Sequence, residues 1–346
     1  MKRNPVQIIV FLLILSSCTG TSESQQASEQ QTDPSNDMPF KVEILDERAL
    51  EIIDKNAEFK VLASGFTWTE GPLWVEEGNF LLFSDIPNNK VYKLDENNNT
   101  TTFITPSGYT GLGSYGSEPG SNALLLNNEG ELILMQHGDR RVARMNATFD
   151  NPQSDFSTVV DNYEGQRFNS PNDGVFDQSG NLYFTDPPYG LPGKMEDSRK
   201  ELSFQGVYCQ LASGELVLID SLSRPNGVTL STDQKRLYVA VSDPGHAVWY
   251  QYDVVSPGQL NNKQVFYDAT QLVGQEGQQG LPDGMKMHSK GFLIASGPGG
   301  VWVFNLEGKP VARIYTGQLT SNCALSTDEK RLFLTADDYI LEVALK

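Results

Sequence analysis

The hexapeptide Pro171-Asn172-Asp173-Gly174-Val175-Phe176 joins a polar turn to the start of an apolar strand. A proline followed by an amide, an acid and a glycine favours a tight turn, and the apolar residues after it favour extended backbone. A second apolar strand, Leu182–Thr185, follows about nine residues later, across a turn containing Gly180 and Asn181. The stretch therefore predicts a hairpin that opens with a polar residue.

The same pattern occurs six times along the chain. The copies begin at Thr69-Glu70-Gly71-Pro72-Leu73-Trp74, Ser121-Asn122-Ala123-Leu124-Leu125, Pro171-Asn172-Asp173-Gly174-Val175-Phe176, Pro225-Asn226-Gly227-Val228, Pro282-Asp283-Gly284-Met285 and Ser321-Asn322-Cys323-Ala324-Leu325. The second strands of these units are predicted at Phe80–Ser84, Leu132–Met135, Leu182–Thr185, Leu237–Val241, Phe292–Ala295 and Leu332–Thr335. Six units of short antiparallel strands predict an all-β fold, a six-bladed β-propeller. A β-sandwich is the alternative, but it gives no reason for a polar residue to open every unit.

The last unit, which ends at Tyr339–Leu345, lacks one strand. An N-terminal strand near Phe59–Ala63 would complete it and close the ring without an exposed sheet edge. We therefore expect the propeller to span residues 41–346.

The N-terminus has the features of an export signal. Met1-Lys2-Arg3 is basic, the apolar run Ile8–Leu15 is too short to span a bilayer, and Leu15-Ser16-Ser17-Cys18 resembles a bacterial lipobox. These features predict a lipoprotein signal peptide over residues 1–17, lipidation of Cys18 and a polar tether over residues 18–40. We then expect a bacterial envelope protein, on the periplasmic side of the outer membrane or at the cell surface, that meets the membrane only through its anchor. An ordinary secretory signal is the alternative.

The composition limits the partners. With 26 basic and 44 acidic residues, the formal net charge of −18 opposes binding to nucleic acid. An acidic protein suits metal cations and uncharged small molecules. Besides Cys18, only Cys209 and Cys323 are present, so the sequence predicts no disulfide framework. We expect a monomer.

The opening residues of the six units would form a ring around the propeller axis, because the innermost strand of each blade lines the central channel. These residues are Glu70, Asn122, Asn172, Asn226, Asp283 and Asn322. Glu70 and Asp283 would repel each other in a dry site unless a cation lay between them. Carboxylate and amide oxygens favour Ca²⁺, although Mg²⁺, Mn²⁺ or Zn²⁺ also remain open. The competing interpretation is that each Asn-Gly or Asp-Gly pair is simply a turn.

Other side chains are candidates for the rim of this ring. His137 follows the second strand of its unit and could bind substrate or transfer protons, or it could simply hydrogen-bond a neighbouring loop. We expect His246 and His288 to face solvent. Trp68, Trp74 and Tyr189 are candidates for the pocket wall, although aromatic residues near strands usually belong to a core.

From about Phe59 to Lys346 the chain resembles the senescence marker protein/gluconolactonase/luciferin-regenerating family, and within it the bacterial gluconolactonase-like branch. The matching motifs are Glu70-Gly71-Pro72-Leu73-Trp74, Gln136-His137-Gly138-Asp139-Arg140-Arg141-Val142, Asn169-Ser170-Pro171-Asn172-Asp173-Gly174, Tyr183-Phe184-Thr185-Asp186-Pro187-Pro188-Tyr189-Gly190, Arg224-Pro225-Asn226-Gly227, Pro282-Asp283-Gly284-Met285-Lys286 and Gly297-Pro298-Gly299-Gly300-Val301-Trp302. The resemblance implies a six-bladed propeller with one divalent ion, usually calcium, at the mouth of the channel.

The resemblance also implies roles for individual residues. The metal ligands would be Glu70, Asn172, Asn226 and Asp283, and Asp283 would also be the general base. Asn122 and Asn322 match the remaining ring positions, where we expect substrate contact or support through water. The family's Arg-x-Asn-Asp-Gly substrate motif is not matched, because Ser170-Pro171-Asn172 separates Arg167-Phe168-Asn169 from Asp173-Gly174.

The resemblance implies a calcium-dependent hydrolase that opens a sugar lactone. The metal would polarise the carbonyl group and Asp283 would activate water. The first alternative is an arylesterase or phosphotriesterase with a similar metal-binding propeller. The second is a propeller that binds sugar or protein without catalysis.

Overall fold

A computed structural model describes residues 40–346, which belong to one compact unit. The predicted signal peptide, Cys18 and nearly all of the predicted tether lie outside the described residues. Within them, the regular secondary structure is almost entirely β-strand, with short 3₁₀ helices at η2 (Glu47–Glu51), η3 (Lys194–Glu196) and η4 (Thr270–Leu272). None of the helices in residues 40–346 is long and apolar enough to cross a membrane.

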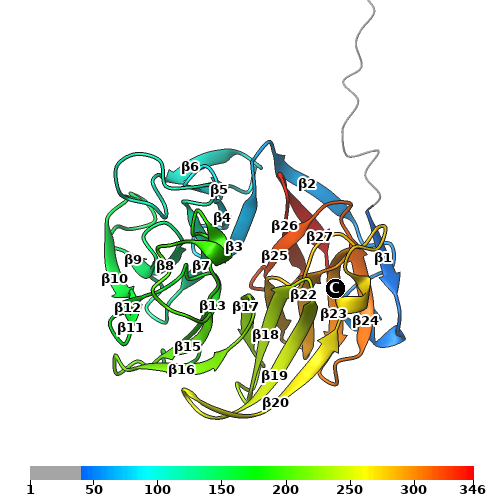
Figure 1. Cartoon of the computed structure of the whole chain (residues 1–346). Helices are drawn as coiled ribbons and strands as arrows, with labels where there is room; N and C mark the ends of the chain where they lie inside the picture. The colour runs from blue at the N-terminus through cyan, green and yellow to red at the C-terminus, as the bar shows by residue number, and fades with distance from the viewer. Residues whose placement is uncertain (1–39) are drawn as a thin grey trace, which may run out of the picture. The chain divides into compact units, whose positions relative to one another are not determined.

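Six antiparallel sheets of four or five strands form the blades of the fold, numbered 1 to 6 (Figure 1). Blade 1 contains β3 (Thr69–Val75), β4 (Phe80–Asp85), β5 (Lys90–Leu94) and β6 (Thr100–Ile104). Blade 2 contains β7 (Ser121–Leu126), β8 (Leu132–Gln136), β9 (Arg141–Met145) and β10 (Phe156–Val160). Blade 3 contains β13 (Gly174–Phe176), β14 (Leu182–Asp186), β15 (Gly206–Gln210) and β16 (Leu216–Ser221).

The second half of the chain repeats this arrangement. Blade 4 contains β17 (Pro225–Leu230), β18 (Arg236–Asp243), β19 (His246–Ser256) and β20 (Gln259–Asp268). Blade 5 contains β21 (Met285–His288), β22 (Phe292–Gly297), β23 (Gly300–Asn305) and β24 (Pro310–Tyr315). Blade 6 contains β25 (Thr320–Leu325), β26 (Arg331–Ala336) and β27 (Tyr339–Ala344). A two-stranded hairpin, β11 (Asn162–Tyr163) and β12 (Gln166–Arg167), follows blade 2.

The first strands of successive blades contact one another in the order β3, β7, β13, β17, β21, β25 and back to β3. This closed circle confirms the predicted six-bladed β-propeller and the predicted repeat.

An N-terminal strand completes the last blade, as predicted. β2 (Phe59–Ser64) pairs antiparallel with β27, with Phe59 opposite Val343 and Ser64 opposite Tyr339. The start of the propeller is thus hydrogen-bonded to its end, and β2 covers the edge that β27 would otherwise leave open. The sequence did not predict β1 (Lys41–Ile44), which pairs with β24 and gives blade 5 a fifth strand.

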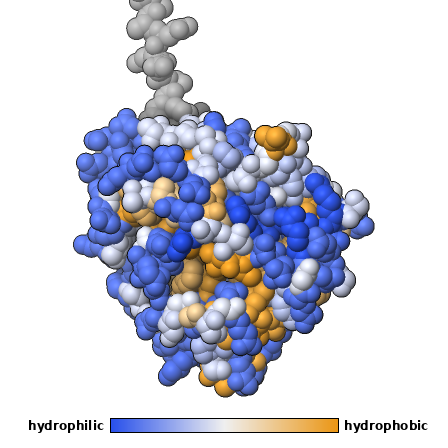
Figure 2. All heavy atoms as spheres, turned by 90° about the vertical axis from the view of Figure 1, so that its left-hand side faces the viewer, coloured by the Kyte–Doolittle hydropathy of each residue, from blue (hydrophilic) through white to orange (hydrophobic). Residues whose placement is uncertain are grey.

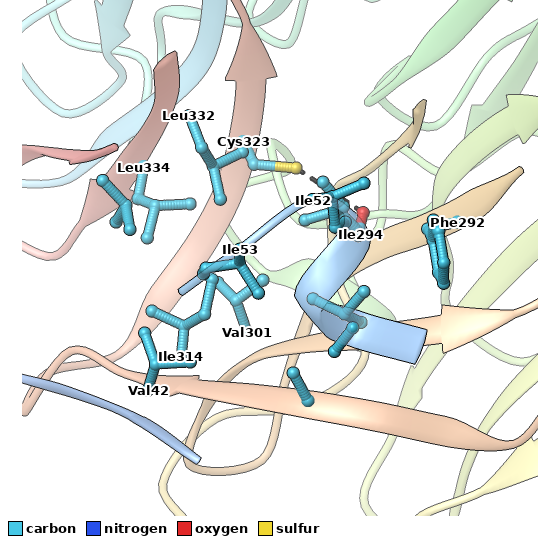
Figure 3. Close-up of a cluster of buried hydrophobic side chains, with 14 of the residues drawn as sticks. Val42, Ile52, Ile53, Phe292, Ile294, Val301, Ile314, Cys323, Leu332 and Leu334 are labelled. Carbon is cyan, nitrogen blue, oxygen red and sulfur yellow. Dashed lines mark hydrogen bonds between the residues drawn. The ribbon is translucent and has the colours of Figure 1, made fainter. Parts of the chain in front are cut away.

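The segment between β1 and β2 is held by apolar packing. Ile52 and Ile53 follow η2 and are fully buried in a cluster with residues of blades 5 and 6, including Ile294 and Leu334 (Figure 3). Burying one such side chain stabilises a fold by about 1.5–3 kcal/mol. The ring closure therefore rests on side-chain packing as well as on strand pairing.

One face of the propeller is largely polar. Figure 2 shows the side that carries β10 and β11 in Figure 1, where hydrophilic residues surround a hollowed apolar area. The two cysteines of the propeller, Cys209 and Cys323, are buried and free, in agreement with a fold that needs no disulfide framework.

Candidate active site

A cavity of about 270 Å³ lies where the innermost strands begin, and residues from all six blades or their connecting loops line it. Five of the six predicted ring residues are on its wall, namely Glu70, Asn122, Asn172, Asn226 and Asp283. The topology argument from the sequence is therefore correct for these five positions.

Breaks in strand pairing accompany the ring residues. The register between the first and second strands shifts between Glu70 and Leu73 in blade 1, and between Pro225 and Val228 in blade 4. Blades 2 and 6 have similar shifts next to Asn122 and Asn322. A bulge re-aims the side chain that it contains, which accounts for polar side chains turned into the channel at the start of apolar strands.

Glycine follows three of the ring residues because neighbouring blades approach closely there. A Cβ atom on Gly71 would lie 2.2 Å from the carbonyl oxygen of Asn122, and Gly71 has a φ of +51°. A Cβ atom on Gly227 would lie 2.2 Å from the carbonyl oxygen of Asp283. The Glu-Gly and Asn-Gly pairs of the repeat are therefore packing requirements as well as turn signals.

Hydroxyl groups at the ends of second strands fix the ring backbone of the next blade. Ser84 Oγ donates to the Asn122 carbonyl oxygen at 2.8 Å, and Thr185 Oγ1 donates to the Asn226 carbonyl oxygen at 2.7 Å. Ser242 Oγ donates to the Pro282 carbonyl oxygen at 2.5 Å, next to Asp283. Each bond satisfies a buried backbone acceptor and ties one ring position to its neighbour.

The cavity strongly disfavours unpaired negative charge. Burial raises the pKa of Glu70 to about 8, and the nearby Asp173 charge adds to the rise. Burial also raises the pKa of Asp283 well above its usual value, with further contributions from Glu70 and Asp173. Asp173 is itself buried, and burial raises its pKa. Three carboxyl groups thus share one electrostatic environment, which a bound cation would favour in the ionised form.

The donor set fits a hard divalent cation. Asp283 Oδ1 and Asn122 Oδ1 are buried without a hydrogen-bond partner in the described part of the chain. Asn226 Nδ2 donates to Ser242 Oγ at 2.9 Å, which leaves its amide oxygen for the cavity. No cluster of three or more His, Cys, Asp or Glu suited to a metal occurs among residues 40–346, so a site here depends on amide oxygens. Such mixed oxygen donors are typical of calcium.

Two residues predicted to bind substrate are not on the cavity wall. Asn322 is buried, and its Nδ2 donates to Glu70 Oε2 at 3.3 Å, so this amide supports Glu70 from behind. His137 is fully buried, and Glu118 is the nearest carboxylate, with Oε2 at 3.8 Å from His137 Nδ1. Both residues sit one layer behind the surface that a ligand would meet.

The other sequence predictions have mixed outcomes. Trp68 and Tyr189 line the cavity, whereas Trp74 lines a different cavity. His246 is exposed as expected, but the prediction for His288 is wrong, because this residue is 1% exposed. Its Nδ1 accepts from the Lys290 N–H inside the turn after β21.

Arg167 does not line the cavity, in keeping with its departure from the family motif. It is exposed in β12, where its guanidinium donates to the Asp139 carbonyl oxygen at 2.7 Å.

The sequence reasoning missed three polar residues at the site. Asp173 lies within the quoted motif, but the repeat assigns the ring position to its neighbour Asn172 and gives no role to Asp173. Glu118 and Lys194 line the cavity from two long loops, where no periodic pattern signals a site. Only their charge could have suggested them.

The fold and the site define a class of protein: a six-bladed β-propeller whose channel mouth carries a buried ring of carboxylates and amides. The family model of the SMP-30/Gluconolactonase/LRE-like region matches residues 68–338 of this chain. The chain belongs to this family.

Individual relatives agree with this assignment. A gluconolactonase of Zymomonas mobilis is 38% identical over 300 residues, which cover 85% of this chain and 83% of that enzyme. A diisopropyl-fluorophosphatase of Loligo vulgaris is 27% identical over 180 residues, 50% of this chain and 55% of that enzyme. Among solved structures, a gluconolactonase from Xanthomonas campestris superposes with a TM-score of 0.76 and 26% identity, covering 88% of this chain and 95% of that one.

Proposed function

We propose that this protein is a hydrolase that opens a sugar lactone, with one divalent cation, calcium, at the channel mouth. The observation that carries the proposal is the cavity where Glu70, Asn172, Asn226 and Asp283 converge. The gluconolactonase of Zymomonas mobilis, similar over most of the chain, supports the substrate class. The acidic net charge of −18 favours an uncharged substrate over an anionic one.

Glu70, Asn172, Asn226 and Asp283 would hold the cation. When bound, a calcium ion would supply a Lewis acid for the ester carbonyl oxygen. Side chains and backbone groups of the protein would orient the ligands of the cation and accept the proton from water. Glu70 is fixed by the Gly71 N–H, which donates to Oε2 at 2.9 Å, so its second oxygen stays available to the cavity.

Asp283 is the proposed general base. Its Oδ1 has no partner among the described residues, and it is therefore free to accept a proton from a water molecule in the cavity. The hydrogen bond from Ser242 to the preceding carbonyl oxygen holds the backbone beside it. Three apolar residues, Ile86, Leu281 and Leu319, also line the cavity and reduce the polar surface that it offers to water.

Substitution of the proposed base tests this assignment. Asp283→Asn keeps the side-chain volume and should lower kcat for gluconolactone by a factor of about 10²–10⁴. Its circular dichroism should match that of the parent protein. Retained turnover would remove Asp283 from the role of base.

Arylesters and phosphotriesters test the second candidate function, which the likeness to the Loligo vulgaris enzyme over half of this chain favours. Turnover of a phosphotriester well above that of any lactone would select this alternative. A protein that binds sugars but hydrolyses none of these substrates would be a binding propeller.

A further inference from the structure

Glu118 and Lys194 form an ion pair on the wall of the cavity. Unlike the ring of carboxylates and amides, this pair includes a positive charge. Lys194 Nζ donates to Glu118 Oε1 at 3.1 Å. The two residues come from different long loops, between β6 and β7 and between β14 and β15. The pair therefore connects the loops of blades 1 and 3 across one side of the cavity.

The backbone of Lys194 adopts a strained conformation. Its φ of +48° lies in the left-handed region, which is uncommon for residues other than glycine. The turn around it is fixed, because the Gly193 N–H donates to Asp197 Oδ2 at 2.6 Å and the Lys194 N–H donates to the Leu191 carbonyl oxygen at 2.8 Å. A strained residue that is held in place at a cavity wall is a candidate for ligand contact.

The pair offers a hydrogen-bond donor beside an acceptor, with no net charge. Two neighbouring hydroxyl groups on a ring match this arrangement, because one can donate to Glu118 while the other accepts from Lys194. An anionic substituent would face the Glu118 carboxylate as well as the ring carboxylates. A lactone without hydroxyl groups would leave both partners unused. The chemistry therefore selects a neutral polyhydroxylated ring.

His137 lies next to Glu118 and is a second possible hydrogen-bond partner for its carboxylate, besides Lys194. Both of its ring nitrogens are buried without a hydrogen-bond partner among the described residues, and Nδ1 is 3.8 Å from Glu118 Oε2. Burial lowers its pKa to about 3, so the ring is neutral near pH 7 and carries one N–H. A small rotation of Glu118 would bring its carboxylate within hydrogen-bond distance of this ring. Glu118 can then remain paired when Lys194 turns to a ligand.

We propose that Glu118 and Lys194 form the site that recognises adjacent hydroxyl groups of a neutral sugar lactone, with His137 as the positioning residue for Glu118. This proposal rests on the proposed lactone hydrolase function and adds the residues by which the site would prefer a hydroxylated neutral lactone over an unsubstituted or carboxylated one. None of the three residues belongs to the proposed cation site.

The test compares two lactones of the same ring size. Gluconolactone carries hydroxyl groups and δ-valerolactone carries none, and kcat/KM is measured for both with calcium present. Lys194→Met and Glu118→Gln should each lower kcat/KM for gluconolactone roughly tenfold to a hundredfold, the effect of losing a charged hydrogen bond. With δ-valerolactone the change should stay below about twofold. Equal losses on both lactones, or no loss on gluconolactone, would overturn the proposal.

Two controls make the result specific. Lys200→Met, on the same loop but outside the cavity wall, should leave kcat/KM unchanged for gluconolactone and for δ-valerolactone. His137→Leu should reproduce the gluconolactone defect, and His137→Gln, which keeps an N–H donor, should restore most of it.

Binding of glucose, a neutral ring with hydroxyl groups and no ester bond, separates the two proposals. A protein that hydrolyses neither lactone but binds glucose in a Lys194-dependent way would refute the hydrolase and support the recognition site. Glucose binding that is unchanged in Lys194→Met would refute the recognition site.

Discussion

Gly227→Ala should disturb the site through packing alone. A Cβ atom there would lie 2.2 Å from the Asp283 carbonyl oxygen and 2.9 Å from the Gly284 Cα. Ordinary van der Waals contact of a Cβ atom begins at 3.4 Å, so blades 4 and 5 must separate by roughly 1 Å next to the proposed base. Both clashing atoms belong to the backbone, and no side-chain rotation can relieve the overlap.

The expected cost follows from this displacement. Overpacking of this kind costs about 1–3 kcal/mol. A domain of roughly 300 residues has an unfolding entropy of about 0.6 kcal/mol/K, so the melting temperature should fall by about 2–5 °C. A shift of 1 Å at a reacting group can lower kcat/KM about a hundredfold.

Gly245→Ala is the matched control in the same blade. Its Cβ would meet only Asp243 Oδ1, at 3.5 Å, and neither Gly227 nor Gly245 has a positive φ. Melting temperature and lactone turnover are measured for both variants. Equal melting temperature and equal lactone turnover in Gly227→Ala and Gly245→Ala would show that the close approach of blades 4 and 5 does not position Asp283.

Three further predictions concern stability. Thr185→Val removes the hydroxyl group that binds the Asn226 carbonyl oxygen, and it should lower the free energy of unfolding in urea by about 1–3 kcal/mol. Burial lowers the pKa of His137 to about 3. Below pH 6.5 this histidine therefore binds a proton in the unfolded chain but stays neutral in the folded chain. Stability from this group is present above pH 6.5 and is lost as pH falls. Between pH 6.5 and 5 the parent protein should therefore lose about 2 kcal/mol that His137→Gln does not lose. Deletion of residues 1–64 removes β1, η2 and β2, exposes the edge of β27 and takes Ile52 and Ile53 out of the core, and it should abolish cooperative thermal unfolding.

The fold could be predicted because every repeat contains a local signal of its own. A polar residue that opens an apolar strand recurs in each blade, and the missing partner in the last unit predicted a strand near Phe59–Ala63, where the structure has β2. β1 was missed because its pairing with β24 joins segments far apart in the chain. No local sequence pattern near Lys41–Ile44 predicts pairing with a strand so distant in the sequence.

The site could be predicted only as far as topology determines it. The ring positions follow from strand order, so five of them were placed correctly on the cavity wall. Asn322 and His137 do not line the cavity, and the sequence could not show this because topology does not determine which way a side chain turns or what covers it. His137 is covered by the loops that carry Gly190 and Glu118, whose conformations depend on contacts distant in sequence.

The central claim is that lactone opening depends on a cation held by the ring of Glu70, Asn172, Asn226 and Asp283. Hydrolysis of gluconolactone by the purified protein, followed with a pH indicator before chelation, after chelation and after calcium is returned, tests it most directly. We predict activity that falls to the uncatalysed rate with chelator and returns with calcium, and that does not return in Glu70→Gln. Full activity in the chelated, metal-free protein would contradict the claim.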